Sequence, residues 1–193
     1  MSQPNKNKLF KLNINAGQWR SRVITFPDVV GLRPTPNRVR ETVFNWLGQT
    51  LHDKTCLDAF AGSGALGFEA ASRGASQVVM CELHKDAAAS LLANAKRLTT
   101  NDATRIEIIN RNVFEYLPTQ QQKFDVVFCD PPFQANLYAP FLMQIQPFLA
   151  VDARLYWESA IQLDRDPTVL ENYEVVKTSR AGAVYFGLLQ SRR

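Results

Sequence analysis

The first strong hydrophobic pattern in the chain has the period of a helix. Thr35 suits the N-cap of this helix, and Pro36 suits its first helical position, where a missing N–H costs nothing. Arg38 lies off the apolar face. The residues spaced i, i+4, i+7 and i+8, which we assign to a buried helix face, are Val39, Val43, Trp46 and Leu47.

From residue 55 onward, short apolar runs alternate with helical segments. We predict strands near residues 55–60, 77–82, 105–110, 124–129 and 153–159. We predict helices over 65–73, 84–98 and 139–149, with a short one near 113–117. Continuous apolar strands separated by helices favour a parallel sheet covered on both faces. Two further strand-like runs, 173–179 and 183–189, are too close for anything but an antiparallel hairpin. The predicted fold class is α/β, a mostly parallel seven-stranded sheet with a C-terminal antiparallel hairpin.

The N-terminal part differs in charge from the rest. Residues 1–54 hold nine Lys or Arg and three acids, a net charge of +6, whereas residues 55–193 hold 13 and 15, a net charge of −2. We expect residues 1–16 to be mobile and the run 19–25 to form a β-hairpin or ribbon. The predicted organisation is thus a basic N-terminal extension, residues 1–54, followed by the α/β domain, residues 55–193. Such an extension indicates a polyanionic partner, although a solvated tail has the same composition.

Composition excludes several classes of protein. A chain of 193 residues with 46% hydrophobic and 21% charged residues is that of one globular domain. It has no apolar run of the ~18 residues that a membrane span needs and no secretory signal pattern at its N-terminus. Cys56, Cys81 and Cys129 lack zinc-ligand spacing, and the chain has two histidines. We therefore expect reduced thiols, no metal, a cytoplasmic location and, by default, a monomer.

A glycine-rich turn follows the predicted strand near residues 55–60. Gly62 to Gly67 satisfy G-x-G-x-x-G between a strand and a helix, which allows a ligand to approach the backbone closely. Glu82 ends the next strand, 20 residues after Gly62, where a carboxylate can accept both ribose hydroxyl hydrogens. The turn itself suits a dinucleotide or S-adenosylmethionine. Asp58 favours the latter, since it can hold an α-ammonium but would repel a pyrophosphate. Ala61 and Gly64 are further residues of the turn that we expect to contact the ligand.

Other positions allow a ligand-binding role and a structural one. By position, Asn112 and Val113 bracket an adenine, with an amide near its exocyclic amine and apolar cover, but Asn112 also suits a helix cap. The alternative for Asp58 is a buried carboxylate that bonds the turn's own N–H groups.

A second motif, DPPF, ends the fourth strand at Asp130, Pro131, Pro132 and Phe133. Two prolines fix the backbone and leave carbonyl acceptors. If Asp130 and the Pro131 carbonyl each accept one hydrogen of an aromatic amine, the nitrogen lone pair can point at a sulfonium methyl. Phe133 would stack on an extruded base. A rigid turn that merely buries a phenylalanine is the alternative.

Together these segments resemble the ribosomal RNA small subunit methyltransferase D family, from about Gly17 to the end of the chain. The resemblance rests on GLRPTPNRVRETVFNWL at 31–47, DAFAGSGALGFEAASRGA at 58–75 and DPPF at 130–133. Two positions depart from the family pattern: Ser21 stands where a glycine is frequent and Asn37 where an aspartate is frequent.

This resemblance implies a class I methyltransferase fold, S-adenosyl-L-methionine as donor, and the N2 amine of guanine 966 in 16S rRNA as acceptor. The substrate would be 16S rRNA, the small ribosomal subunit or an assembly intermediate. For Trp19, packing within the protein and stacking on RNA are equally expected. The arginines expected to contact RNA phosphates are Arg20, Arg22, Arg33, Arg38 and Arg40.

Other functions remain open at this stage. DPPF also suits adenine N6 in DNA or RNA, and the related NPPY form suits a glutamine amide. An NAD-dependent oxidoreductase would use the glycine turn but leaves Asp58 and DPPF unexplained. A non-enzymatic RNA-binding module would not need Asp58, Glu82 and Asp130 together.

Overall fold

The computed structural model describes residues 8–29, 31–99, 104–131 and 137–192. Its main sheet has the strand order β5-β4-β3-β6-β7-β9-β8, in which the first five strands are parallel and β9 is antiparallel to both neighbours. The strands are β3 (Thr55–Asp58), β4 (Gln77–Cys81), β5 (Arg105–Ile109), β6 (Phe124–Cys129), β7 (Leu149–Ser159), β8 (Tyr173–Ala181) and β9 (Val184–Ser191). The predicted α/β class and terminal hairpin are confirmed.

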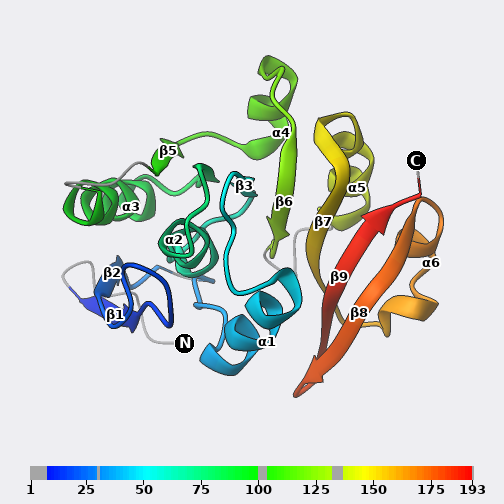
Figure 1. Cartoon of the computed structure of the whole chain (residues 1–193), viewed down its shortest axis with the longest axis horizontal. Helices are drawn as coiled ribbons and strands as arrows, with labels where there is room; N and C mark the ends of the chain where they lie inside the picture. Colours follow the sequence, from blue (N-terminus) through cyan, green and yellow to red (C-terminus); the bar gives the residue numbers. More distant parts are fainter. Residues whose placement is uncertain (1–7, 30, 100–103, 132–136, 193) are drawn as a thin grey trace.

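Helices cover both faces of this sheet (Figure 1). The α-helices are α1 (Asn37–Leu47), α2 (Ala65–Ser72), α3 (Lys85–Leu98), α4 (Val113–Tyr116), α5 (Tyr138–Ile145) and α6 (Pro167–Leu170). Short 3-10 turns are η1 (Leu117–Thr119), η3 (Gln146–Phe148) and η4 (Leu163–Arg165). Among the described helices, none is both long and apolar enough to span a bilayer.

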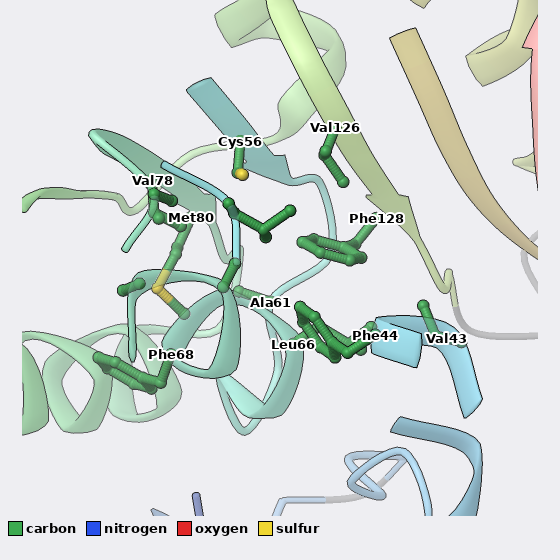
Figure 2. Close-up of a cluster of buried hydrophobic side chains, with 14 of the residues drawn as sticks. Val43, Phe44, Cys56, Ala61, Leu66, Phe68, Val78, Met80, Val126 and Phe128 are labelled. Atoms are coloured by element: carbon green, nitrogen blue, oxygen red, sulfur yellow. The ribbon is translucent and has the colours of Figure 1, made fainter. Parts of the chain in front are cut away.

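Two hydrophobic clusters lie on the two faces. One joins α1, α2 and α3 to the sheet through side chains such as Phe44, Leu66 and Phe128, as Figure 2 shows. The other packs α4, α5 and α6 against the opposite face, with Phe141 and Trp157 among its buried members. Both clusters are continuous along several parallel strands, whose two buried faces explain the unbroken apolar runs in the sequence.

The N-terminal segment is more ordered than its polar composition indicated. Strand β1 (Leu9–Asn13) pairs antiparallel with β2 (Val23–Pro27), so the expectation of mobility up to residue 16 is wrong for residues 9–13. The predicted ribbon exists, but its second strand begins at Val23. Ser21 turns the chain with φ +65°, the left-handed region that favours glycine.

The start of α1 also differs from the prediction. The helix begins at Asn37 with Pro36 as its cap residue, and no side chain caps it. Thr35 is buried and donates instead to Asp130. Trp46 is half-buried and stacks on Phe186 with ring centroids 5.6 Å apart.

A buried carboxylate on α2 joins the N-terminal segment to the sheet. Glu69 is 0% exposed, and its oxygens accept the backbone N–H groups of Asn15 at 2.8 Å and Ala16 at 3.1 Å. Two buried arginines complete the site, Arg73 at 2.9 Å and Arg40 at 3.5 Å. Because Asn15 and Ala16 belong to the N-terminal segment and Arg40 belongs to α1, Glu69 fixes how the extension meets α2.

We predict that Glu69→Ala destabilises the protein by about 3–5 kcal/mol, because it leaves Arg40 and Arg73 buried without their counter-charge. Urea denaturation followed by circular dichroism measures this. Glu174→Ala, at an exposed position of β8, is the matched control and should cost under about 0.5 kcal/mol. A loss below about 1 kcal/mol for Glu69→Ala would contradict the structural role of this network.

Candidate active site

Three acidic side chains meet where neighbouring strands end. Asp58 ends β3, Asp130 follows β6 directly, and Glu158 is the second-last residue of β7. Asp58 is level with Phe128, two residues before Asp130, and the residues preceding Asp130 and Glu158 are themselves register partners. Adjacent strands lie about 4.8 Å apart. The parallel topology thus gathers the three carboxyl groups at one edge of the sheet.

Backbone hydrogen bonds fold the glycine turn against the next strand. Ala61 N–H donates to the Cys81 carbonyl at 2.9 Å, and Gly64 N–H donates to Ala61 at 2.7 Å. Glu82 lies at the end of β4 and accepts the N–H of Gly62 at 2.8 Å through Oε2. The sequence prediction that Glu82 and the turn form one site is consistent with this contact, in which the carboxylate also has a structural role.

The two glycines of the turn differ in their surroundings. Both have positive φ, +51° at Gly62 and +80° at Gly64. A Cβ on Gly64 would lie 2.6 Å from carbons of Leu91 and Phe68, whereas one on Gly62 would meet nothing closer than Leu32 Cγ at 3.7 Å. Gly64 is therefore required for packing of α2, whereas at Gly62 a Cβ would make only an ordinary van der Waals contact.

Asp58 is buried at 3% exposure beneath this turn. Its Oδ2 accepts the N–H of Gly67 at 2.9 Å, the structural contact considered from the sequence. Burial raises the pKa of Asp58 to about 7, and nearby Glu82 adds to the rise while the Gly67 bond opposes it. A cation placed beside Asp58 would lower this pKa again, so the residue is suited to bind an ammonium group.

The positions expected near an adenine have local roles. The Asn112 side chain caps α4 by accepting the N–H of Phe114 at 3.1 Å, and Val113 is 2% exposed. Both therefore show the structural role that the sequence left open. Asn110, which sequence reasoning missed, donates to the carbonyls of Glu82 at 2.8 Å and of Leu83 at 3.1 Å.

The described half of DPPF is hydrogen-bonded to the loop before α1 and to the start of α5. Asp130 is half-buried and its Oδ2 accepts the Thr35 hydroxyl at 3.4 Å. Pro131 is buried, and its carbonyl accepts the Tyr138 hydroxyl at 3.4 Å. Two predicted site residues lie outside the described residues: Pro132 and Phe133.

Asp130 contacts a second acidic side chain. It shares a hydrogen bond with Glu158, which in turn accepts the Tyr156 hydroxyl. Burial raises the pKa of Asp130, and the negative charges of Glu158 and Asp58 raise it further. Glu158 was not singled out from the sequence, and Thr35 was predicted only as a helix cap, because no local motif links either residue to Asp130.

The predicted RNA-contacting arginines fall into two groups. Arg40 is 1% exposed, and its Nη1 and Nη2 donate to the Asn13 carbonyl at 3.2 Å in addition to its ion pair with Glu69. A guanidinium held in this way is not on the surface, so Arg40 is corrected from an RNA contact to a structural residue. Trp19, at 2% exposure, belongs to the core. The arginines that are exposed are Arg20, Arg22, Arg33 and Arg38.

Within the described ranges, no group of three or more His, Cys, Asp or Glu is arranged to hold a metal ion. Cys56, Cys81 and Cys129 are each buried and unpaired. Burial raises the pKa of all three thiols, which opposes thiolate chemistry at these positions.

Solved protein structures have a similar fold. A putative methyltransferase from Escherichia coli, yhhF, matches with a TM-score of 0.82 and 36% identity, over 94% of this chain and 98% of that chain. A Thermus thermophilus 16S rRNA N2 G1207 methyltransferase, solved with AdoMet and guanosine, matches in fold with a TM-score of 0.74 and 22% identity, over 96% of this chain and 50% of that chain. The strand order and the glycine turn define a class I S-adenosylmethionine-dependent methyltransferase.

Sequence relatives narrow this class. The family profile described as Conserved hypothetical protein 95 matches residues 12–190. Proteins named ribosomal RNA small subunit methyltransferase D are 38% identical in Escherichia coli K12, over 98% of this chain and 95% of that protein, and 40% identical in Haemophilus influenzae, over 94% of each. The chain belongs to the ribosomal RNA small subunit methyltransferase D family, as its motifs indicated.

The surroundings of the two glycines lead to a stability prediction. Gly64→Ala should destabilise the fold by about 2–4 kcal/mol, because left-handed strain adds to overpacking against Leu91 and Phe68. Gly62→Ala, which meets only an ordinary contact, should cost about 1–2 kcal/mol. Urea denaturation of both variants measures the difference. Equal losses would mean that the turn has no packing role at Gly64.

Proposed function

We propose that this protein transfers a methyl group from S-adenosylmethionine to the N2 amine of a guanine in 16S rRNA, at position 966. The observation that carries the proposal is the closeness of the glycine turn and the Asp130 motif. Ala59 N–H donates to the Phe128 carbonyl at 3.0 Å, so the two segments leave the sheet side by side. The names of the full-length relatives support the rRNA substrate.

The residues around the turn suit the proposed donor. The donor supplies a methyl group on a positively charged sulfur. Asp58 would hold its α-ammonium, because a buried carboxyl with a raised pKa gains most from a nearby cation. The backbone at Gly62 and the carboxylate of Glu82, which are already hydrogen-bonded to each other, would hold the ribose, with Ala61 and Gly64 completing the turn.

The acceptor amine would be held by Asp130 and Pro131. Each offers one oxygen to one N–H of the exocyclic amine, which fixes the direction of the nitrogen lone pair. As the nitrogen bonds to the methyl carbon, the carbon–sulfur bond breaks and its electrons remain on sulfur. The amine then carries a positive charge, which an adjacent carboxyl group stabilises before taking the proton. Phe133 would stack on the base.

The positive charge of the N-terminal extension supports RNA as the partner. The exposed arginines Arg20, Arg22, Arg33 and Arg38 lie on the N-terminal extension, which has a net charge of +6 while the rest of the chain has a net charge of −2. Arginines contact phosphates without reading sequence, so they would position the substrate while the site selects the base.

A direct test incubates the protein and labelled S-adenosylmethionine with deproteinised 16S rRNA, with small ribosomal subunits, and with duplex DNA. Nucleoside mass spectrometry of the product identifies the modified atom. We expect N2-methylguanosine from one of the two ribosomal substrates. N6-methyladenosine, or transfer to DNA alone, would overturn the proposed acceptor.

We predict that Asp130→Ala folds normally, binds S-adenosylhomocysteine with unchanged affinity, and transfers methyl groups about 10²–10⁴ times more slowly, since it loses the acceptor of the amine proton. Single-turnover transfer to the substrate found above gives the rate, and calorimetry gives the affinity. Asp125→Ala, on the same strand but away from its carboxyl end, is the control. Full activity of Asp130→Ala would contradict this mechanism.

We also predict that donor affinity depends on pH through Asp58. With a pKa of about 7 before binding, Asp58 is largely neutral below pH 6 and ionised above pH 8. The affinity for S-adenosylhomocysteine should therefore rise up to about tenfold per pH unit below pH 7 and level off above it. Calorimetry from pH 5.5 to 8.5 measures the change. Asp58→Asn should bind more weakly with a flat profile, and an unchanged pH dependence in that variant would contradict the assignment.

A further inference from the structure

Glu158 is a buried acid that the chemistry described so far does not use. It is 8% exposed on β7, where Phe186 of β9 is its register partner. The Tyr156 hydroxyl donates to its Oε1. Its other side-chain contact is a hydrogen bond with Asp130. The second contact places the carboxyl group of Glu158 against Asp130, the group that would hold the amine.

The groups facing this pair are acidic or neutral. Asp58 approaches from β3, Cys129 belongs to β6, and Tyr138 comes from α5, each close enough to interact electrostatically with Asp130. Thr35 donates to Asp130 from the loop before α1. Among the described residues, the ion pairs involve Arg40, Lys54, Arg73 and Arg105, and none of them reaches Asp130 or Glu158.

A hydrogen bond between two carboxyl groups requires a proton on one of them. Two carboxylates in contact repel each other, so such a pair loses its two protons in separate steps. The Tyr156 hydroxyl favours the charged form of Glu158, which leaves the shared proton on Asp130. Asp130 then donates through one oxygen and keeps the other as an acceptor.

We propose that Glu158 is a positioning residue which shares one proton with Asp130 and withdraws that proton when Asp130 takes one from the methylated amine. This inference rests on the proposed function. The nitrogen–carbon bond forms as the carbon–sulfur bond breaks, and an N–H proton moves to Asp130. The proton already on Asp130 moves to Glu158. The pair changes from one negative charge to none, and it returns the proton to water after the product leaves.

A purely structural role does not explain this arrangement. An apolar residue at position 158 would pack against Phe186 without the cost of desolvating a second acid. Two acids placed together at the end of adjacent strands, with a tyrosine hydroxyl oriented toward one of them, are instead typical of a site that holds a proton.

The test compares single-turnover methyl transfer by the wild-type protein and Glu158→Gln between pH 5 and 9.5. The wild-type profile should be bell-shaped, because activity requires the pair to hold one proton. Glu158→Gln should be slower by about tenfold or more at pH 7. It should also lose the alkaline decline, since a single carboxyl has no second proton to lose. Calorimetry with S-adenosylhomocysteine checks that the variant is folded and binds the donor normally.

Two further variants make the test independent of that one substitution. Tyr156→Phe removes the donor that favours ionised Glu158, so its acid limb should move to higher pH. Glu158→Asp keeps the carboxyl group and should recover part of the rate lost in Glu158→Gln. Glu174→Gln, at an exposed position, should match the wild type in rate and profile.

The outcomes separate this inference from the proposed function. If the wild-type protein methylates rRNA and Glu158→Gln keeps its rate and its profile, only the role of Glu158 is overturned. If Glu158→Gln does not fold, the pH profile of Tyr156→Phe decides. A decline at low pH that stays where it is in the wild type overturns the role of Glu158, and a decline that moves to higher pH supports it. Absence of transfer by the wild-type protein overturns the proposed function, and this inference with it.

Discussion

The neutralisation of Glu69 is the constraint on which the two halves of the site depend. Glu69 lies on α2, the helix that begins directly after the glycine turn, and it pairs with Arg40 of α1. Thr35, two residues before α1, reaches Asp130 at 3.4 Å. Glu69 thus connects the helix after the glycine turn, where we propose the donor binds, to the segment that contacts Asp130, where we propose the acceptor binds. Because it is buried, it tolerates little change in the position of either helix.

The carboxyl edge of the sheet holds acids under conditions that oppose their ionisation. Burial raises the pKa of Asp58, Asp130 and Glu158, and their mutual repulsion adds to the effect at Asp130. Such an arrangement costs stability in the free protein, and it is relieved when a cation arrives. The proposed donor brings an ammonium and a sulfonium, and the proposed reaction briefly forms a cationic amine. The buried acids, which a nearby cation would stabilise, would therefore favour both donor binding and methyl transfer.

The sequence predicted what local patterns determine. Gly62 and Glu82 belong to one strand–turn–helix–strand unit, so their spacing was sufficient to place them together. Thr35 and Glu158 are separated from Asp130 by 95 and 28 residues, and only the strand order brings them near it. Arg40 was misassigned because a charge on a helix predicts a surface position, and its buried partner Glu69 lies on another helix. Strand β1 was missed because its segment is rich in polar residues, and its order comes from pairing with β2.

The N-terminal ribbon is fixed to the catalytic body, which changes how an RNA would meet it. The Thr25 carbonyl on β2 accepts the side chains of Ser90 at 2.6 Å and Asn94 at 2.7 Å on α3, and the Asn94 oxygen accepts the Thr25 N–H at 3.2 Å. Arg22 donates to the Leu98 carbonyl at 3.3 Å on the same helix. These contacts hold the ribbon on α3 in one orientation. Helix α3 begins three residues after Glu82, so phosphate contacts on the ribbon would be made at a fixed position relative to the glycine turn. A mobile tail loses conformational entropy when it binds, and a ribbon held in this way would lose little.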